Sequence, residues 1–204
     1  MGTHNSRCEY PLTQGGDVVA ERSTAEARRE SIRRVAGTAF ATSGLHGVSV
    51  ATIAAEVGIS EAYVFSLFGN KRALFIDVVV TACDELTAGI AASAVGLGGA
   101  DALTAMGRAY VGLLADRQRL LLPMQGFAAC SDPVIRAAMQ DAFGRLWATA
   151  ARSSGSDDVT VKTFVALGML TNTLAALDVD HIDSDWARAA RGFVPLGYRA
   201  AESG

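Results

Sequence analysis

The segment from Ser49 to Phe75 constrains the fold of this chain more than any other. Apolar residues recur at helical spacing through residues 50–57, Gly58 follows, and Ser60 then opens a second short apolar stretch. The pair Asn70-Lys71 opens a third and longer one. Two short helices joined by a tight, glycine-containing turn make up the unit that places its second helix in the DNA major groove. The segment therefore predicts a helix-turn-helix.

The composition is that of a folded globular protein. Half of the 204 residues are hydrophobic and only 19% are charged, which excludes an intrinsically disordered chain. Charged residues and glycines interrupt the apolar runs before about 18 positions, and the N-terminus lacks an apolar leader, so we expect no transmembrane helix, no signal peptide and a cytoplasmic location. Cys8, Cys83 and Cys130 are odd in number and far apart, which favours reduced thiols.

The formal net charge of −3 is unevenly distributed. Residues 21–75 carry seven basic and five acidic side chains, whereas residues 76–204 carry ten basic and fourteen acidic ones. A mildly basic N-terminal part followed by an acidic remainder fits a regulator better than a protein that coats polyanions. The asymmetry is small, so it supports the helix-turn-helix prediction without establishing it.

Helical periodicity continues through most of the chain, and no internal repeat or convincing strand interrupts it. We therefore predict an all-α fold of about nine helices. Besides the three helices of residues 49–93, the expected helices are 24–44, 101–122, 124–130, 133–152, 159–177 and 185–199. Gly44 is expected to end the first of these and Pro123 to stop the second. The expected organisation is a disordered arm over residues 1–22, a DNA-binding domain over 23–75 and a second helical domain over 76–204.

A longer pattern of apolar, glycine, cap and aromatic residues spans residues 28–75. Its members are Phe40, Gly44, Val50, Ile53, Ala54, Val57, Gly58, Ile59, Ser60, Val64, Phe65, Phe68, Asn70, Lys71, Leu74 and Phe75. In order and spacing this pattern resembles the N-terminal domain of the tetracycline-repressor-like (TetR) family of bacterial transcription regulators. Two positions depart from the family. Tyr63 stands where a small hydroxyl residue is usual, and Phe65 stands where tyrosine is usual, so the aromatic hydroxyl has moved two positions upstream.

The resemblance implies which side chains meet DNA. Those directed at the phosphate backbone are Arg28, Arg29, Ser49, Thr52 and Lys71. Those on the second helix of the motif are Ser60, which caps it, and the base readers Glu61, Ala62, Tyr63 and Ser66. Glu61 can accept from a cytosine amine and Ala62 can touch a thymine methyl, whereas Phe65 and Phe68 are expected to pack into the core. An ordinary role stays open for each candidate: Tyr63 as a packed aromatic, and the cations as solvated side chains.

Beyond residue 76 no motif is recognisable, and the resemblance implies a helical domain that binds a small effector and forms a homodimer. At a dimer interface of the last two helices we expect Val165, Gly168, Met169, Asn172, Ala175, Ala176, Trp186 and Phe193. Lining an effector cavity we expect Leu86, Met106, Tyr110, Leu113, Met124, Phe127, Cys130, Phe143, Trp147 and Asn172. Helix 159–177 is apolar around most of its circumference and needs cover on two sides, and Met and aromatic side chains suit adaptable pockets. The open alternatives are a buried monomeric core helix and ordinary core packing.

No metal or cofactor site is predicted. The acidic link Asp178–Asp185 lacks the glycine and glutamate that a calcium loop requires, the histidines and cysteines lack zinc spacing, and Gly96–Gly99 follows a helix rather than a strand. The sequence favours a ligand-responsive regulator that binds a palindromic operator in double-stranded DNA as a homodimer. It would act as a repressor released by a small apolar or aromatic effector. The alternatives are a small-molecule-binding module without DNA recognition and a helical-bundle enzyme.

Overall fold

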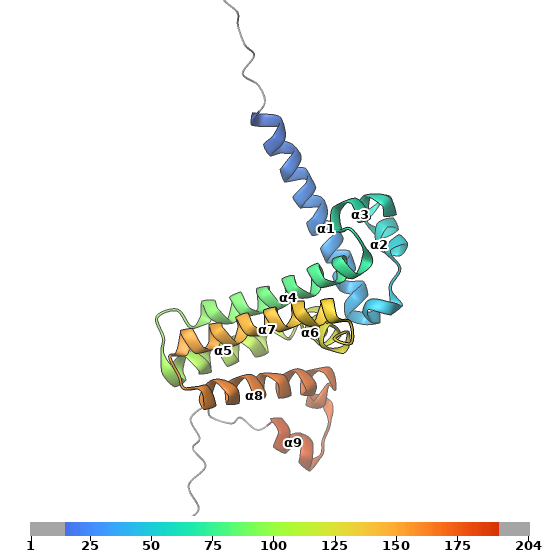
Figure 1. The fold of residues 1–204 in the computed structure, drawn as a ribbon. Coiled ribbons are helices and arrows are strands. Elements are labelled where there is room, and N and C mark those ends of the chain that lie inside the picture. The colour runs from blue at the N-terminus through green and yellow to red at the C-terminus, as the bar shows by residue number, and fades with distance from the viewer. Residues whose placement is uncertain (1–14, 192–204) are drawn as a thin grey trace, which may run out of the picture.

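The structure, a computed structural model, describes residues 15–191, and these form nine α-helices and one short 3-10 helix without a strand (Figure 1). The helices are α1 Gly15–Gly47, α2 Val50–Val57, α3 Glu61–Phe68, α4 Lys71–Ser93, α5 Gly99–Leu113, α6 Arg117–Ala128, α7 Pro133–Ser154, α8 Asp158–Ala176, η1 Val179–His181 and α9 Asp185–Arg191. The predicted all-α fold is confirmed. Helices α2, α3 and α4 begin and end nearly where the sequence places them.

Helix α1 is longer than predicted. It begins at Gly15, so residues 15–22, which were expected in a disordered arm, are helical, whereas residues 1–14 lie outside the described residues. The chain has no proline between Pro11 and Pro123, and an acidic residue near the start of a helix is favoured by the helix dipole, so the sequence allows this extension. Gly44, with φ of 65°, kinks α1 at its predicted end.

The break between α5 and α6 lies before Pro123 rather than at it. The side chain of Asp116 caps α6 by accepting a hydrogen bond from the N–H of Gln118 at 2.9 Å. Pro123 therefore lies inside α6, where it is buried. The predicted stop at this proline and the separate helix 124–130 are wrong. The aspartate cap sets the start of the helix, and the helix tolerates the loss of one backbone donor.

Two hydrophobic clusters organise the molecule. The first joins α1–α4 to α6 and α7, and within it the rings of Phe40 and Phe75 meet edge to face with centroids 5.1 Å apart. The second joins the C-terminal half of α4 to α5, α7 and α8 around the fully buried Leu103 and Met106. Leu122 of α6 belongs to the first cluster. The boundary that the sequence predicts between residues 75 and 76 therefore lies within the first hydrophobic cluster, which contains residues from both of its sides.

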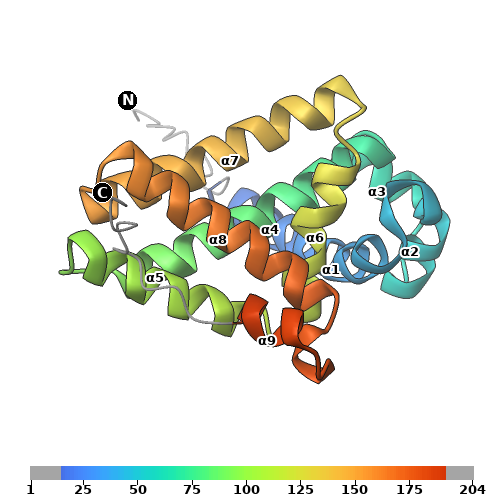
Figure 2. The same ribbon diagram turned by 90° about the horizontal axis from the view of Figure 1, so that it is seen from below.

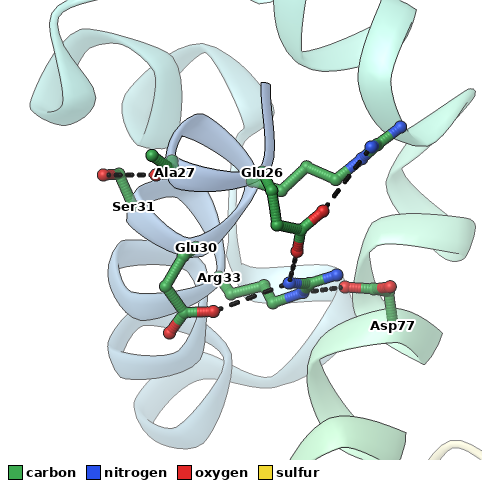
Figure 3. A network of polar contacts seen from close by, with 7 residues as sticks. Glu26, Ala27, Glu30, Ser31, Arg33 and Asp77 are labelled. Carbon is green, nitrogen blue, oxygen red and sulfur yellow. Dashed lines mark hydrogen bonds and ion pairs between the residues drawn. The ribbon is translucent and has the colours of Figure 1, made fainter. Parts of the chain in front are cut away.

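Helix α4 runs between the two parts of the molecule, with α2 and α3 on one side of the body and α8 and α9 on the other (Figures 1 and 2). Near its start, Asp77 accepts a 2.7 Å hydrogen bond from Nε of Arg33 on α1, and Arg33 also bonds Glu26 at 2.8 Å (Figure 3). The Asp77 bond is the main cause that raises the pKa of Arg33, and the Arg33 bond is the main cause that lowers the pKa of Glu26. Further along α4, Asp84 accepts bonds of 2.9 and 3.0 Å from Arg145 of α7. These pairs hold α4 against α1 and α7.

Candidate DNA-binding surface and ligand cavity

The turn between α2 and α3 is fixed at both of its ends. Gly58 ends α2 with φ of 75°, a left-handed conformation that favours glycine, and its N–H donates to the carbonyl of Ala55. Ser60 opens α3, and its hydroxyl accepts a 3.2 Å hydrogen bond from the N–H of Tyr63. The chain bends by 105° between the two helices, as in a helix-turn-helix. Ser60 thus positions α3 as its cap.

Helix α3 buries only one of its sides. Val64 is fully buried and Phe68 is partly buried against the first cluster. The exposed residues are Glu61, Ala62, Tyr63, Phe65 and Ser66, which include all four predicted base readers. The expectation that Phe65 packs into the core is wrong, because 37% of its surface is exposed. Each residue turns about 100° around a helix, which carries Phe65 away from the side that Val64 buries.

The start of α2 offers backbone donors to an anion. Ser49 has the extended backbone of an N-cap residue, but its hydroxyl makes no capping hydrogen bond, and Thr52 is exposed in the first turn. In contrast, Asn70 caps α4 by accepting a 2.9 Å bond from the N–H of Ala73. The first N–H groups of α2 lack such an acceptor, and the helix dipole adds partial positive charge. A phosphate oxygen is the group that suits this place.

The cations near this surface divide into paired and unpaired ones. Arg29 lies 3.7 Å from Glu26, which also pairs with Arg33. Arg28 is exposed, and Lys71 is partly exposed in the first turn of α4, directly after α3. Neither Arg28 nor Lys71 has an ion pair with a side chain of residues 25–191. Of the predicted phosphate-binding cations, these two therefore have charges that no carboxylate of residues 25–191 offsets.

A cavity of about 50 Å³ lies where the two hydrophobic clusters meet. It is lined by Cys83, Leu86, Thr87, Ile90, Tyr110, Pro123, Phe127, Met139, Ala142, Phe143, Leu146, Met169 and Asn172. Nearly all of these are apolar, and the main polar feature is a 2.6 Å hydrogen bond that the hydroxyl of Tyr110 on α5 donates to Asn172 on α8. Desolvation raises the pKa of Tyr110. Desolvation, followed by the nearby charge of Asp84, raises the pKa of Cys83 to about 11.

Five of the ten predicted cavity residues line this space. They are Leu86, Tyr110, Phe127, Phe143 and Asn172. Those that do not are Met106, Leu113, Met124, Cys130 and Trp147. Met106 is buried in the second cluster, and Leu113 and Trp147 pack against it, while Cys130 packs against the first. On α4 the cavity residues follow the helical period from Cys83 to Ile90, a signal that could have extended the prediction from Leu86.

Helix α8 has a second face that the described chain leaves uncovered. Besides Asp158, Lys162 and Met169, its exposed positions recur every three or four residues, at Val159, Thr163, Ala166, Leu170, Thr173 and the C-cap residue Leu177. We call these six residues the α8 stripe. The hydroxyls of Thr163 and Thr173 donate to carbonyls of the same helix at 2.8 and 3.2 Å, so the stripe presents mainly methyl groups. Figure 2 shows α8 running across one side of the body.

The predicted interface residues are placed on different sides of α8 and α9. Met169 and Trp186 are exposed, and Met169 also lines the cavity. Val165 and Asn172 are buried in their own subunit, and Gly168 lies beside the ring of Tyr110. The residues Ala175 and Ala176 are partly buried, and Phe193 lies outside the described residues. The small residues of α8 thus face inward as well as outward.

By length and composition α8 could also cross a membrane, and only 22% of its most apolar 18-residue window is buried. The sequence predicts no such helix, because charged residues and glycines interrupt its apolar runs, whereas the mean hydropathy of α8 is 1.3 over the whole window. The charged residues of α8 lie near its N-terminal end, at Asp158 and Lys162. In residues 15–191, no group of His, Cys, Asp and Glu side chains is placed to hold a metal ion.

The comparisons with known proteins agree with this geometry. Residues 32–78 match the family of bacterial regulatory proteins called the tetR family. A solved structure described as a TetR-family transcriptional regulator from Mesorhizobium loti superposes with a TM-score of 0.63 at 21% identity, over 82% of this chain and 91% of that one. Another from a Rhodococcus species gives 0.61 at 21% identity, over 79% and 93%. A third, from Thermus thermophilus, gives 0.54 at 18% identity, over 78% and 92%. No curated protein matches the sequence.

The fold and the exposed side of α3 define an all-α protein with a helix-turn-helix. Within that class, residues 32–78 match the tetR family of bacterial regulatory proteins, and the chain shares its fold with solved structures described as TetR-family regulators. The matched residues contain α2 and α3, which supports a DNA-binding regulator.

Proposed function

We propose that the protein is a cytoplasmic repressor that binds an inverted repeat in double-stranded DNA as a homodimer and is released by a small neutral ligand. The observation that carries the proposal is the exposed side of α3, held on a 105° bend beside an uncapped α2 N-terminus. Phosphate contacts from Ser49, Thr52, Arg28 and Lys71 would position the protein, and α3 would read base edges. The role as a repressor follows the habit of the family.

The homodimer is proposed to form through the α8 stripe. Because the inner side of α8 packs on α5 and α7, its outer apolar side needs a second partner. A repeat of three and four residues is the spacing at which two helices pack lengthwise, and Ala166 permits close approach. Trp186 of α9, 53% exposed, would extend the contact. A two-fold dimer presents two α3 helices to two half-sites.

The cavity favours a small, neutral, apolar or aromatic ligand with one hydrogen-bonding group. No charged side chain lines it, so an ionic ligand would lose its hydration without gaining a partner. The Tyr110–Asn172 pair can exchange its mutual hydrogen bond for one to a ligand hydroxyl or carbonyl. A volume of about 50 Å³ holds a few water-sized molecules, so a larger ligand must displace side chains. The flexible thioethers of Met139 and Met169 are suited to that movement.

Two cavity helices also contact the DNA-binding part. Helix α4 lines the cavity from Cys83 to Ile90, and its first residue follows directly on α3. Helix α6 lines it with Phe127, and Gln125 of the same helix donates to the carbonyl of Ala41 on α1 at 3.3 Å. A ligand that enlarges the cavity would shift α4 and α6 and change the separation of the two α3 helices. It must bind the two conformers with different affinity, because equal affinity shifts nothing.

DNA recognition is tested by selection from a pool of randomised duplexes with the purified protein. We expect an inverted repeat whose half-sites lie about one helical turn or a multiple apart. The variant Ala62→Glu places a second carboxylate on the exposed side of α3 and should select nothing, while its thermal unfolding and sedimentation match the unsubstituted protein. A folded, unsubstituted dimer that enriches no sequence would reject the proposed function.

Ligand release is tested with a panel of neutral phenols and aromatic ketones, each matched to a carboxylate of similar size. We expect a neutral compound, and not its matched carboxylate, to raise the unfolding temperature and to displace the protein from the selected duplex. The variant Ala142→Phe fills the cavity from α7 and should keep DNA binding while losing the response. If the compound displaced Ala142→Phe and the unsubstituted protein from the duplex equally, the ligand would bind outside this cavity.

A further inference from the structure

The helix that meets the bases lacks the side chains that most often read purines. Arg and Lys read guanine through O6 and N7, and Asn and Gln read adenine through N6 and N7. Helix α3 has the sequence EAYVFSLF and contains none of these four residue types. The nearby Asn70 accepts a hydrogen bond from the N–H of Ala73, so its carbonyl oxygen already caps α4. Helix α3 therefore lacks the side chains that usually form hydrogen bonds with guanine or adenine.

The exposed side of α3 is instead centred on apolar groups. With about 100° per residue, Ala62 lies opposite the buried Val64, and Phe65 and Ser66 flank it. Glu61 and Tyr63 lie at the two edges. The hydroxyl of Ser66 donates to the carbonyl of Tyr63 at 2.8 Å, so its proton is already used within α3. A methyl group and an aromatic ring, 37% exposed at Phe65, thus occupy the middle of the surface.

We propose that the protein selects its operator half-site through the C5-methyl groups of thymine, with Phe65 as the specificity-determining residue and Ala62 beside it. The C5-methyl group of thymine is the apolar feature of the base edges in the major groove. The small side chain of Ala62 lets the helix backbone approach the groove floor, and the adjacent ring of Phe65 removes methyl surface from water. The half-site is accordingly rich in A·T pairs at the positions that Ala62 and Phe65 face. This inference rests on the proposed DNA binding and adds the kind of base that is read.

Replacing thymine by deoxyuridine tests the inference, because the exchange removes only the C5-methyl group. The probe is the duplex enriched from the randomised pool, with thymines replaced one at a time. At the one or two positions that face Phe65, each replacement should weaken binding about four-fold, the value of burying one CH₂ group. Thymines outside the protected half-sites serve as the control and should be insensitive.

A double-mutant cycle that combines Phe65→Ala with the deoxyuridine replacement tests whether Phe65 causes the loss of affinity. In Phe65→Ala the same deoxyuridine replacement should have no further effect, so the two changes are not additive. Phe65→Leu, a milder change at an exposed position, keeps an apolar side chain and should retain part of the sensitivity. Tyr63→Phe keeps the ring at the edge of α3. Deoxyuridine replacement should therefore weaken the binding of this variant by the same factor as in the unsubstituted protein. Thermal unfolding of each variant shows whether the helix-turn-helix is intact.

The outcomes separate this inference from the proposed function. Enrichment of a half-site whose fixed positions are guanines, or binding that is insensitive to every deoxyuridine replacement, overturns the methyl reading while DNA recognition stands. Equal deoxyuridine sensitivity in Phe65→Ala and the unsubstituted protein overturns the role of Phe65. Enrichment of no duplex overturns both proposals. A thymine-dependent half-site whose methyl sensitivity disappears in Phe65→Ala supports both.

Discussion

The molecule exposes apolar residues on two sides, and the two surfaces are built differently. Helix α3 has eight residues between fixed ends and exposes two separate aromatic rings, Tyr63 and Phe65. Helix α8 has 19 residues and exposes a continuous stripe of aliphatic and small side chains. Separate rings on a short, fixed helix suit contacts with individual groups in a groove, whereas a stripe with a repeat of three and four residues suits another helix. Helix length and the spacing of exposed residues, rather than exposed apolar area alone, therefore distinguish the partners.

A charge in the middle of the α8 stripe should have the largest effect. Leu170→Glu would bury a carboxylate in the proposed interface, and we expect the dissociation constant of the dimer to rise on the order of 100-fold or more. Sedimentation velocity over a range of concentrations measures it. Leu97→Glu is the matched control, because Leu97 and Leu170 are both 45% exposed and Leu97 lies between α4 and α5. A Leu170→Glu protein that sediments like this control would show that the stripe is not the interface.

On the α3 side, loss of an unpaired cation should weaken binding to all duplexes alike. Lys71→Ala should reduce affinity roughly five-fold per lysine at 0.15 M salt and lower the slope of log K against log salt concentration by about 0.9 per lysine. Fluorescence anisotropy at several salt concentrations gives both values. Arg108→Ala removes the same charge from exposed α5 and should leave the slope nearly unchanged. Equal slopes for Lys71→Ala and the unsubstituted protein would exclude a phosphate contact.

On the inner side of α8, the prediction concerns the hydrogen bond from Tyr110 of α5 to Asn172. Tyr110→Phe removes the donor and leaves the 4% exposed Asn172 without it, so we expect a loss of about 1–3 kcal/mol in the free energy of unfolding. Urea denaturation measures this change. Tyr63→Phe makes the same chemical change on exposed α3 and should be nearly neutral. Similar stability of both variants would show that the bond does not hold α5 to α8.

The smallest expected effect concerns the cavity thiol. With a pKa of about 11, Cys83 stays protonated near neutral pH, so iodoacetamide should modify it more slowly than in the unfolded chain, where the ordinary value is 9.0. The folded state holds this proton more tightly, so its contribution to stability declines as pH rises from about 9 to about 11. Mass spectrometry after timed alkylation follows the modification. Equal rates in native and unfolded protein at pH 8 would contradict a desolvated thiol.

The DNA-binding part was predictable because its signals are local. A positive-φ turn at Gly58 and caps at Ser60 and Asn70 fix the helix limits from the sequence itself. The sequence predicts a buried Phe65, because aromatic residues usually pack inward, whereas the rotation of α3 on its neighbours leaves the ring exposed.

The second domain was harder to predict because its features depend on tertiary contacts. The sequence marks α8 as apolar, but its rotation turns Val165 inward and Leu170 outward. The cavity draws residues from five helices, so single-helix patterns find Leu86 and miss Met139. The sequence predicts a helix end at Pro123, whereas in the packed structure the capping side chain of Asp116 outweighs the backbone donor that proline lacks.

The central claim is that two copies paired through the α8 stripe place their α3 helices in successive major grooves on one face of DNA. Hydroxyl-radical footprinting of the selected duplex tests it most directly. The expected result is two protected patches of the same sequence in inverted orientation, with centres about 34–36 Å or a multiple apart, both lost together in Leu170→Glu. A single protected patch, or two patches that persist in a monomeric Leu170→Glu protein, would contradict the claim.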